Sequence, residues 1–174
     1  RRVVELHEMG AKFSPTGPDT IAWIQQRWQS ATLPAAATPQ AAHFANGLTL
    51  LGYHAQPATV AAGGALCVTL YWQVETVPAA PANIFVHFIA NDGFVQAQRD
   101  TTGVLDFFPL TEWPTDQIMG DLHCMTLPAG LAPGSYSVQA GLYDPATGAR
   151  LLATVGATNA TEDAVPLTEV TLQP

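Results

Sequence analysis

A strict alternation of apolar and polar side chains over residues 65–75 constrains the fold more than any other feature of the sequence. Side chains on a β-strand point alternately to the two faces of its sheet, so this pattern predicts a strand with one buried face. The inward set is Leu66, Val68, Leu70, Trp72 and Val74, and the outward set is Cys67, Thr69, Tyr71 and Gln73. One face of this strand is therefore expected to contribute large apolar residues to a core.

Similar short apolar runs recur after residue 44, and turn residues separate them. The 14 glycines and 14 prolines of the 174-residue chain are spread between the runs, as is typical of an all-β protein. The runs predict strands over residues 48–55, 65–75, 83–91, 94–100, 117–127, 135–143, 149–154 and 165–172. We expect residues 83–91, interrupted only by His87, to form a central strand covered on both faces.

About eight antiparallel strands joined by short turns predict an all-β fold, an immunoglobulin-like β-sandwich. The alternation predicts substantial burial for a set of core residues, namely Val68, Leu70, Trp72, Val86, Phe88, Tyr136, Val138 and Leu142.

The first 43 residues are expected to lie outside this sandwich. Residues 21–28 carry apolar side chains at helical spacing behind a pair of capping residues, which predicts a short helix. Residues 30–42 are rich in Ala, Pro and Thr without any period, as linkers are. We therefore divide the chain into an N-terminal connecting segment with a linker at 1–43 and a β-sandwich domain at 44–174. The chain starts at Arg1 without a signal-peptide pattern, and we expect it to be a fragment of a larger protein.

The charge balance excludes one class of partner. Six basic residues face fourteen acidic ones, which gives a net charge of −8, and charged residues make up only 11% of the chain. A surface of this sign repels phosphate backbones, so we expect no nucleic-acid partner. The longest apolar stretch, residues 84–90, is interrupted by His87 and is far shorter than the roughly 20 residues that a membrane-spanning helix needs.

The sequence contains no pattern that predicts catalysis or a cofactor. The five histidines and two cysteines lack the spacing of a zinc site, so we expect no metal. Asp100 with Asp106, or Asp116 with Asp121, are carboxylate pairs of the kind glycosidases use, but acidic side chains are also common at turns and sheet edges. No nucleophile elbow or phosphate-binding loop is present. We expect a protein that is not an enzyme.

One polar cluster is predicted from strand pairing. If Asp92 and Gly93 form a two-residue hairpin loop, counting back along the strands sets His87 opposite Gln98 and places Asp100 on the same face. We interpret the cluster as a hydrogen-bonded group that satisfies a half-buried histidine.

Several short motifs in a fixed order resemble a known family. They are Leu50-Leu51-Gly52-Tyr53, Leu70-Tyr71-Trp72-Gln73, Phe85-Val86-His87-Phe88, Gln98-Arg99-Asp100, Trp113, Leu127-Pro128, Pro133-Gly134-Ser135-Tyr136, Gly141-Leu142-Tyr143-Asp144 and Thr147-Gly148-Ala149-Arg150-Leu151. Over residues 44–172 the chain resembles the extracytoplasmic β-sandwich domain at the C-terminal side of bacterial multi-spanning membrane glycosyltransferases of the dolichyl-phosphate-mannosyltransferase-like kind. The resemblance implies a membrane-anchored parent protein that carries the catalysis, and an accessory domain at the cell surface or in the periplasm.

Three functions remain open for such a domain. It could bind carbohydrate or a cell-envelope polymer, because sandwich domains stack sugars on exposed aromatic rings. The candidate rings are Trp113, in a long loop, and Tyr143 and Tyr71, on the outward register of their strands. It could instead be a structural or docking module whose outward aromatic residues lie in a protein–protein interface. A glycoside hydrolase ranks last.

The two cysteines are candidates for a disulfide. Cys67 and Cys124 both lie on the outward register of predicted strands that are neighbours in many sandwiches. An extracytoplasmic location would allow their oxidation. The alternative is that each remains a free cysteine, which behaves as a small apolar residue.

Overall fold

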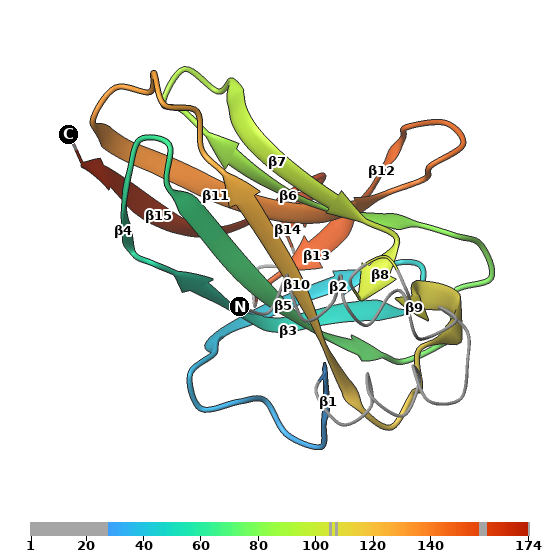
Figure 1. Ribbon diagram of the computed structural model, residues 1–174. Coiled ribbons are helices and arrows are strands. Elements are labelled where there is room, and N and C mark those ends of the chain that lie inside the picture. Colours follow the sequence, from blue (N-terminus) through green and yellow to red (C-terminus); the bar gives the residue numbers. More distant parts are fainter. Residues whose placement is uncertain (1–27, 105, 107, 157–159, 174) are drawn as a thin grey trace, which may run out of the picture.

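The protein is a two-layered β-sandwich in the computed structural model, which describes residues 28–104, 106, 108–156 and 160–173 (Figure 1). The predicted all-β sandwich fold is confirmed. A seven-stranded sheet faces a six-stranded sheet, and a short two-stranded ribbon lies at one end. Neighbouring strands pair antiparallel, apart from β4 and β15, which pair parallel.

The strands have the following bounds. In spatial order, the seven-stranded sheet contains β1 (Gln29–Ser30), β10 (Ile118–Thr126), β5 (Ala65–Val74), β3 (Leu48–Gln56), β2 (Thr38–Phe44), β13 (Ala153–Val155) and β14 (Ala160–Glu162). The other sheet contains β4 (Thr59–Ala61), β15 (Val165–Gln173), β11 (Gly134–Tyr143), β6 (Asn83–Ile89) and β7 (Val95–Thr101), with β12 (Arg150–Leu151) paired to β11. The ribbon is β8 (Gly103–Val104) with β9 (Phe108–Pro109), and a 3₁₀ helix, η1 (Leu110–Glu112), follows it.

The core lies between the two sheets and contains the residues that the alternation predicts. Val68, Leu70, Trp72, Val86, Phe88, Tyr136, Val138 and Leu142 are all buried, so this prediction is confirmed. Burying a side chain of this size contributes roughly 1.5–3 kcal/mol. Aromatic contacts add to the packing: Phe44 lies 5.7 Å from Trp72 and Phe88 lies 4.7 Å from Tyr136, measured between ring centroids.

Strand β6 lies between β11 and β7, next to the edge of its sheet, and one residue on its outer face is also buried. Phe85 points outward yet is only 1% exposed. Its ring fills the space above Gly141, where a Cβ atom would come within 2.5 Å of the phenylalanine Cζ. The guanidinium of Arg150 covers the ring at 4.8 Å from its centroid. The expectation of a central strand covered on both faces is therefore correct only in part, because Phe85 is the one outward residue of β6 that is buried.

The predicted domain boundary at residue 44 is wrong. Strand β2 pairs with β3 on one side and β13 on the other, so the sandwich begins before this position. The composition of β2 resembles that of a linker, because only Ala42 and Phe44 of this strand point into the core. A bulge in the pairing of β2 with β3 lies between Pro39 and Ala42. A bulge is one of the few places where a strand accepts proline. The helix predicted over residues 21–28 lies outside the described residues, except for its last residue.

The strand predicted over residues 149–154 is two strands in different sheets. β12 pairs with β11, whereas β13 pairs with β2. Leu152, 56% exposed, separates them where the chain crosses from one sheet to the other. A local pattern gives no signal for such a crossing, because both pieces remain extended.

Candidate functional site

A pocket of about 200 Å³ lies on the outer face of the seven-stranded sheet. Strands β1, β10 and β5 contribute most of its lining, which consists of Trp28, Gln29, Ser30, Pro34, Thr69, Tyr71 and Gly120. We call it the Trp28–Tyr71 pocket. Tyr71, one of the three rings proposed from the sequence to bind carbohydrate, is therefore part of a formed pocket.

The floor of the pocket follows from strand alternation and one glycine. The register of β5 sends Thr69 and Tyr71 outward, and Tyr71 lies directly opposite Gly120 on β10. A Cβ atom at Gly120 would lie 3.6 Å from Tyr71 Cε1 and 3.7 Å from Thr69 Cγ2, which are ordinary contacts. The nearest atom to such a Cβ is the Trp28 carbonyl oxygen at 3.5 Å, also an ordinary contact, so the strand has room for a Cβ at this position and the glycine leaves that space open.

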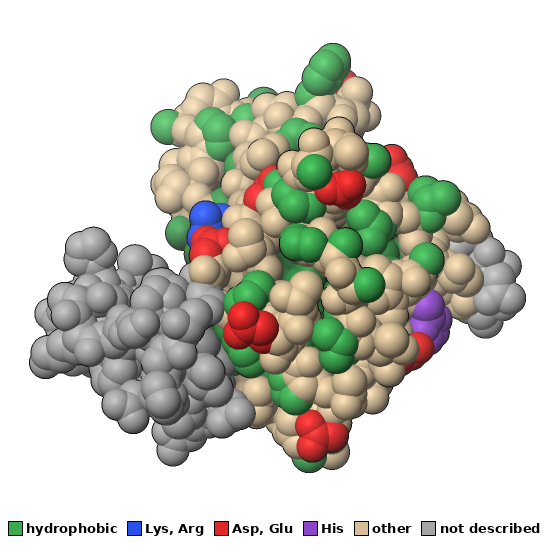
Figure 2. All heavy atoms as spheres, turned by 90° about the vertical axis from the view of Figure 1, so that its right-hand side faces the viewer, with side chains coloured by type: hydrophobic (Ala, Val, Ile, Leu, Met, Phe, Trp, Pro, Cys, Tyr) green, Lys and Arg blue, Asp and Glu red, His purple; other side chains and the backbone are tan. Residues whose placement is uncertain are grey.

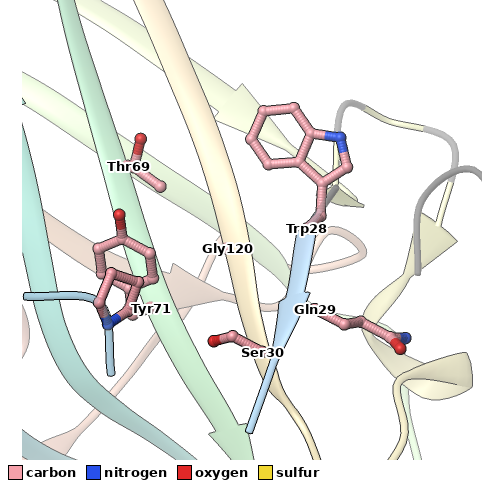
Figure 3. Close-up of a pocket in the computed structure, with 7 residues that line it drawn as sticks. Trp28, Gln29, Ser30, Thr69, Tyr71 and Gly120 are labelled. Carbon is pink, nitrogen blue, oxygen red and sulfur yellow. The ribbon is translucent and has the colours of Figure 1, made fainter. Parts of the chain in front are cut away.

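The opposite wall comes from the short edge strand β1. Gln29 pairs with Met119 and Ser30 pairs with Ile118, which holds the preceding Trp28 beside the edge of the sheet. In Figure 3 the Trp28 indole and the Tyr71 ring lie on opposite sides of Gly120.

The polar groups of the pocket are uncharged. The Thr69 hydroxyl lies beside Tyr71, and the Ser30 hydroxyl donates a hydrogen bond to the Thr32 carbonyl oxygen at 2.8 Å. Burial raises the pKa of Tyr71, so its phenol stays protonated at neutral pH and can donate a hydrogen bond. Two aromatic side chains together with the hydroxyl groups of Ser30, Thr69 and Tyr71 suit a ligand that has both apolar faces and hydroxyl edges.

Of the other two predicted platforms, Trp113 has no free aromatic face and Tyr143 has a hydroxyl that is already hydrogen-bonded. Trp113 is 1% exposed, and its indole N–H donates to the Phe108 carbonyl oxygen at 2.8 Å, so the prediction that it stacks on a ligand is wrong. Its loop folds back onto the core through η1, so that this tryptophan is enclosed. Tyr143 is half-buried and held by two hydrogen bonds: its hydroxyl accepts from the Asn83 amide and donates to Asp100.

The register of the predicted polar cluster is confirmed. His87 lies opposite Gln98, and Asp100 lies opposite Phe85. The hairpin differs from the predicted one, because Ala90 N–H donates to the Phe94 carbonyl oxygen and leaves three residues in the loop. A bulge in β7 then shifts the pairing by one residue, so that His87 still lies opposite Gln98.

The interpretation of this cluster as a hydrogen-bonded group that satisfies His87 is wrong, because among the described residues no hydrogen bond joins His87 to Gln98 or Asp100. Gln98 is exposed, Asp100 Oδ2 accepts from Tyr143, and His87 Nδ1 and Asp100 Oδ1 are buried without a hydrogen-bond partner among the described residues. Burial lowers the pKa of His87, and the nearby charge of Arg150 acts in the same direction while Asp100 opposes it. We therefore expect a neutral imidazole at pH 7, whose ring is tilted by 35° against the Phe85 ring with the two ring centroids 4.5 Å apart.

A second polar group, which the sequence analysis did not assemble, lies completely inside the sandwich. Asp121 and His123 are both 0% exposed, and Asp121 Oδ2 lies 2.6 Å from His123 Nε2. His123 Nδ1 lies 3.0 Å from the Arg99 carbonyl oxygen, and the Thr101 hydroxyl donates to Asp121 at 3.1 Å. Because a carbonyl oxygen only accepts, Nδ1 must carry a proton.

This buried pair joins the two sheets. Arg99 belongs to β7, the edge strand of its sheet, so no further strand can donate a hydrogen bond to its carbonyl oxygen. His123 of β10 donates this hydrogen bond instead. Asp121 and His123 share the inward register with Met119 and Met125, and that alternation is the signal that could have placed them in the core. Their burial makes them structural, since they lie away from any surface where a ligand could reach them.

Cys67 and Cys124 form a disulfide in the structure. They lie directly opposite one another on β5 and β10, with Cα atoms 4.1 Å apart. The bridge lies in the same two strands as Thr69, Tyr71 and Gly120, and it therefore ties together the strands that form the pocket floor.

The described part of the chain contains no group of three or more His, Cys, Asp or Glu side chains that could hold a metal ion. Three of the four carboxylates considered for acid–base catalysis have other partners: Asp106 binds Arg99 at 2.6 Å, Asp100 accepts from the Tyr143 hydroxyl, and Asp121 is enclosed with His123. Within the described residues, no helix is long and apolar enough to cross a membrane.

Comparison with known proteins finds structural likeness at low sequence identity. No protein-family model and no curated protein sequence matches the chain. Among solved structures, the chain is similar to the C-terminal domain of Wzt, with 13% sequence identity and a TM-score of 0.43, covering 87% of this chain and 84% of that one. The fold class described above rests on the strand pairing of this chain itself.

Proposed function

We propose that this domain is a carbohydrate-binding module without catalytic activity, and that it works outside the cytoplasm as an accessory part of a larger membrane glycosyltransferase-like protein. The observation that carries the binding function is the Trp28–Tyr71 pocket. It combines two aromatic side chains, a floor left open by Gly120 and uncharged hydroxyl donors.

Sugar rings match this combination. A pyranose has weakly polar C–H faces that stack on aromatic rings and a rim of hydroxyl groups that exchange hydrogen bonds. In the pocket, Trp28 and Tyr71 offer aromatic surface, and the hydroxyls of Ser30, Thr69 and Tyr71 offer hydrogen-bonding partners. None of the pocket residues carries a charge at neutral pH, which favours a neutral saccharide.

The location outside the cytoplasm is supported by the disulfide between Cys67 and Cys124, since such bridges persist in oxidising compartments. The accessory role is supported by the positions of the family motifs. Trp72 and Leu142 are core residues, and Asp144 caps a turn through Ala146 N–H at 2.7 Å. Residues shared with the family would thus maintain the sandwich, while the catalytic work would belong to the parent protein.

The test begins with a glycan array of neutral and acidic saccharides, followed by calorimetric titration of the strongest hit. Trp28→Ala and Tyr71→Ala should each weaken binding by about 1 kcal/mol, or roughly fivefold in Kd, because each removes a stacking face. Phe94→Ala is the matched control, since this ring is 70% exposed but lies outside the pocket. Equal losses in all three variants would contradict a specific role for the pocket.

Gly120→Val provides an independent test that does not remove a contact. The added Cβ fits at ordinary distances, and valine suits a strand better than glycine, so thermal stability should be unchanged or higher. The γ-methyl groups would occupy the pocket floor, so saccharide binding should be lost. A Gly120→Val variant that binds as tightly as the wild type would rule out this pocket as the binding site.

A further inference from the structure

A second pocket, of about 440 Å³, lies at one end of the sandwich and differs in character from the first. Four separate segments form it: the chain entering β6, the end of β7, the β9–η1 segment and the turn after β11. Its lining is mostly apolar and includes Pro81, Pro109, Pro145 and Leu110. We call it the proline pocket. Figure 2 faces this end and shows apolar side chains gathered there.

The walls of the proline pocket are held in place before any ligand arrives. Proline rings have a fixed φ, so three of the lining residues have little conformational freedom to lose. Asn83, at the start of β6, is held by its hydrogen bond to the Tyr143 hydroxyl, which in turn donates to Asp100. Leu110 N–H donates to the Thr102 carbonyl oxygen, which attaches the η1 segment to the end of β7. A preorganised pocket binds more tightly, because no ordering cost is paid on binding.

The surroundings of the pocket are acidic. Asp144 precedes Pro145 on one side, and Glu112 follows Thr111 on the other. The Ala146 backbone N–H and the Thr147 hydroxyl hold the pKa of Asp144 below its ordinary value, so it is ionised at neutral pH. In Figure 2, red acidic side chains stand among and around the apolar ones, and they clearly exceed the blue basic side chains.

Charge decides between the partners that an apolar pocket could accept. A second copy of this chain carries the same net charge of −8 and would be repelled, as would an anionic lipid surface. A saccharide is a poorer match, because most of the lining residues are apolar and the amide of Asn83, one of the three polar ones beside Thr102 and Thr111, already donates to the Tyr143 hydroxyl. A positively charged segment is attracted, and an apolar side chain on that segment can fill the pocket.

We propose that the proline pocket is a docking site for a basic segment of a partner protein, which inserts one large apolar or aromatic side chain between the three prolines and places flanking Lys or Arg residues beside Asp144 and Glu112. This surface is separate from the Trp28–Tyr71 pocket, since the two share no lining residue. The domain would thus bind its saccharide and its protein partner at different places.

The test uses the blocked tripeptide Lys-Trp-Lys as the probe and Glu-Trp-Glu as its charge-reversed counterpart, titrated into the ¹⁵N-labelled 174-residue chain at low salt. With Lys-Trp-Lys, the amide resonances of Asn83, Thr102 and Thr111 should shift. Glu-Trp-Glu should bind at least tenfold more weakly. Raising the salt from about 20 to about 200 mM should weaken the Lys-Trp-Lys complex severalfold, because its charges are exposed.

Variants that neutralise one carboxylate at a time test the contribution of Asp144 and Glu112. Asp144→Asn and Glu112→Gln should each weaken Lys-Trp-Lys binding by about twofold to fivefold, the range expected for one exposed ion pair. Asp92→Asn is the matched control, because it makes the same charge change at the other end of β6, in the hairpin that leads to β7. Thr111→Phe, which places a ring at the rim of the pocket, should abolish binding.

Three results would overturn the proposal. Equal affinity for the two tripeptides would show that charge does not select the partner. Shifts at Thr69 and Gly120 in place of the proline-pocket amides would show that the tripeptide uses the other pocket. Shifts that depend on protein concentration without any peptide would show that the surface binds a second copy of the chain.

Discussion

Replacing both members of the Cys67–Cys124 disulfide by alanine should lower the stability of the domain by about 2–4 kcal/mol. The bridge joins residues 57 apart in sequence, and closing a loop of that length in the unfolded chain corresponds to about 4 kcal/mol of lost conformational entropy. Both side chains face outward and are half-buried, so alanine leaves no large core cavity to add to this figure. The loss is a large share of the roughly 5–15 kcal/mol that stabilises a typical domain.

Urea denaturation followed by tryptophan fluorescence measures this effect, because the chain has four tryptophans and Trp72 is completely buried. The reduced wild type should unfold at the same urea concentration as the double alanine variant, well below the oxidised wild type. The variant itself should not respond to the reducing agent, which is the internal control. If reduction leaves the wild-type midpoint unchanged, the bridge does not constrain the unfolded chain and the reasoning from loop length is refuted.

Three further substitutions follow from the packing. Gly141→Ala should lower the thermal midpoint through a loss of about 1–3 kcal/mol, because its Cβ would lie 2.5 Å from the Phe85 ring; an unchanged midpoint would mean that the ring moves freely. Asp121→Ala should cost about 3–5 kcal/mol in urea denaturation, because it leaves His123 buried without its carboxylate, and a loss below about 1 kcal/mol would contradict the buried pair. Because the pKa of His87 is lowered in the folded protein, the unfolded chain binds more protons than the folded one just below pH 6.5. The free energy of unfolding should therefore decrease as the pH is lowered from 7 to 5. In His87→Gln the urea midpoint should depend less on pH over this range. An unchanged pH dependence would mean that other groups cause it.

Several strands could be predicted almost to the residue because period two is a local property. The alternation at residues 65–75 corresponds to β5, and every large apolar residue assigned to its inner face is buried. The pairing of His87 with Gln98 was also predicted, although the three-residue loop and the bulge that produce it were not. The longer loop and the bulge each shift the pairing by one residue in opposite directions. The register counted from a two-residue hairpin therefore agreed with the structure.

The binding surface was less predictable, because outward register does not determine exposure. Tyr71 and Trp113 were both candidates from the sequence, with Trp113 and Tyr143 expected first, yet Tyr71 lines a pocket and Trp113 is enclosed by its own loop. Strand β2 was assigned to a linker, because a strand between two neighbours needs few large residues of its own when Ala42 and Phe44 supply the inward contacts.

The sequence by itself determined the positions of most of the long strands, the two faces of those strands and the acidic character of the surface, since each depends on residue identity and spacing along the chain. Only the tertiary structure decided which strands are neighbours, and therefore which outward residues meet. Tyr71 faces Gly120 across a strand pair separated by almost fifty residues, and Trp28, which precedes the edge strand β1, is still further from Gly120 in the sequence. Such contacts arise from the packing of whole strands, which no local pattern encodes.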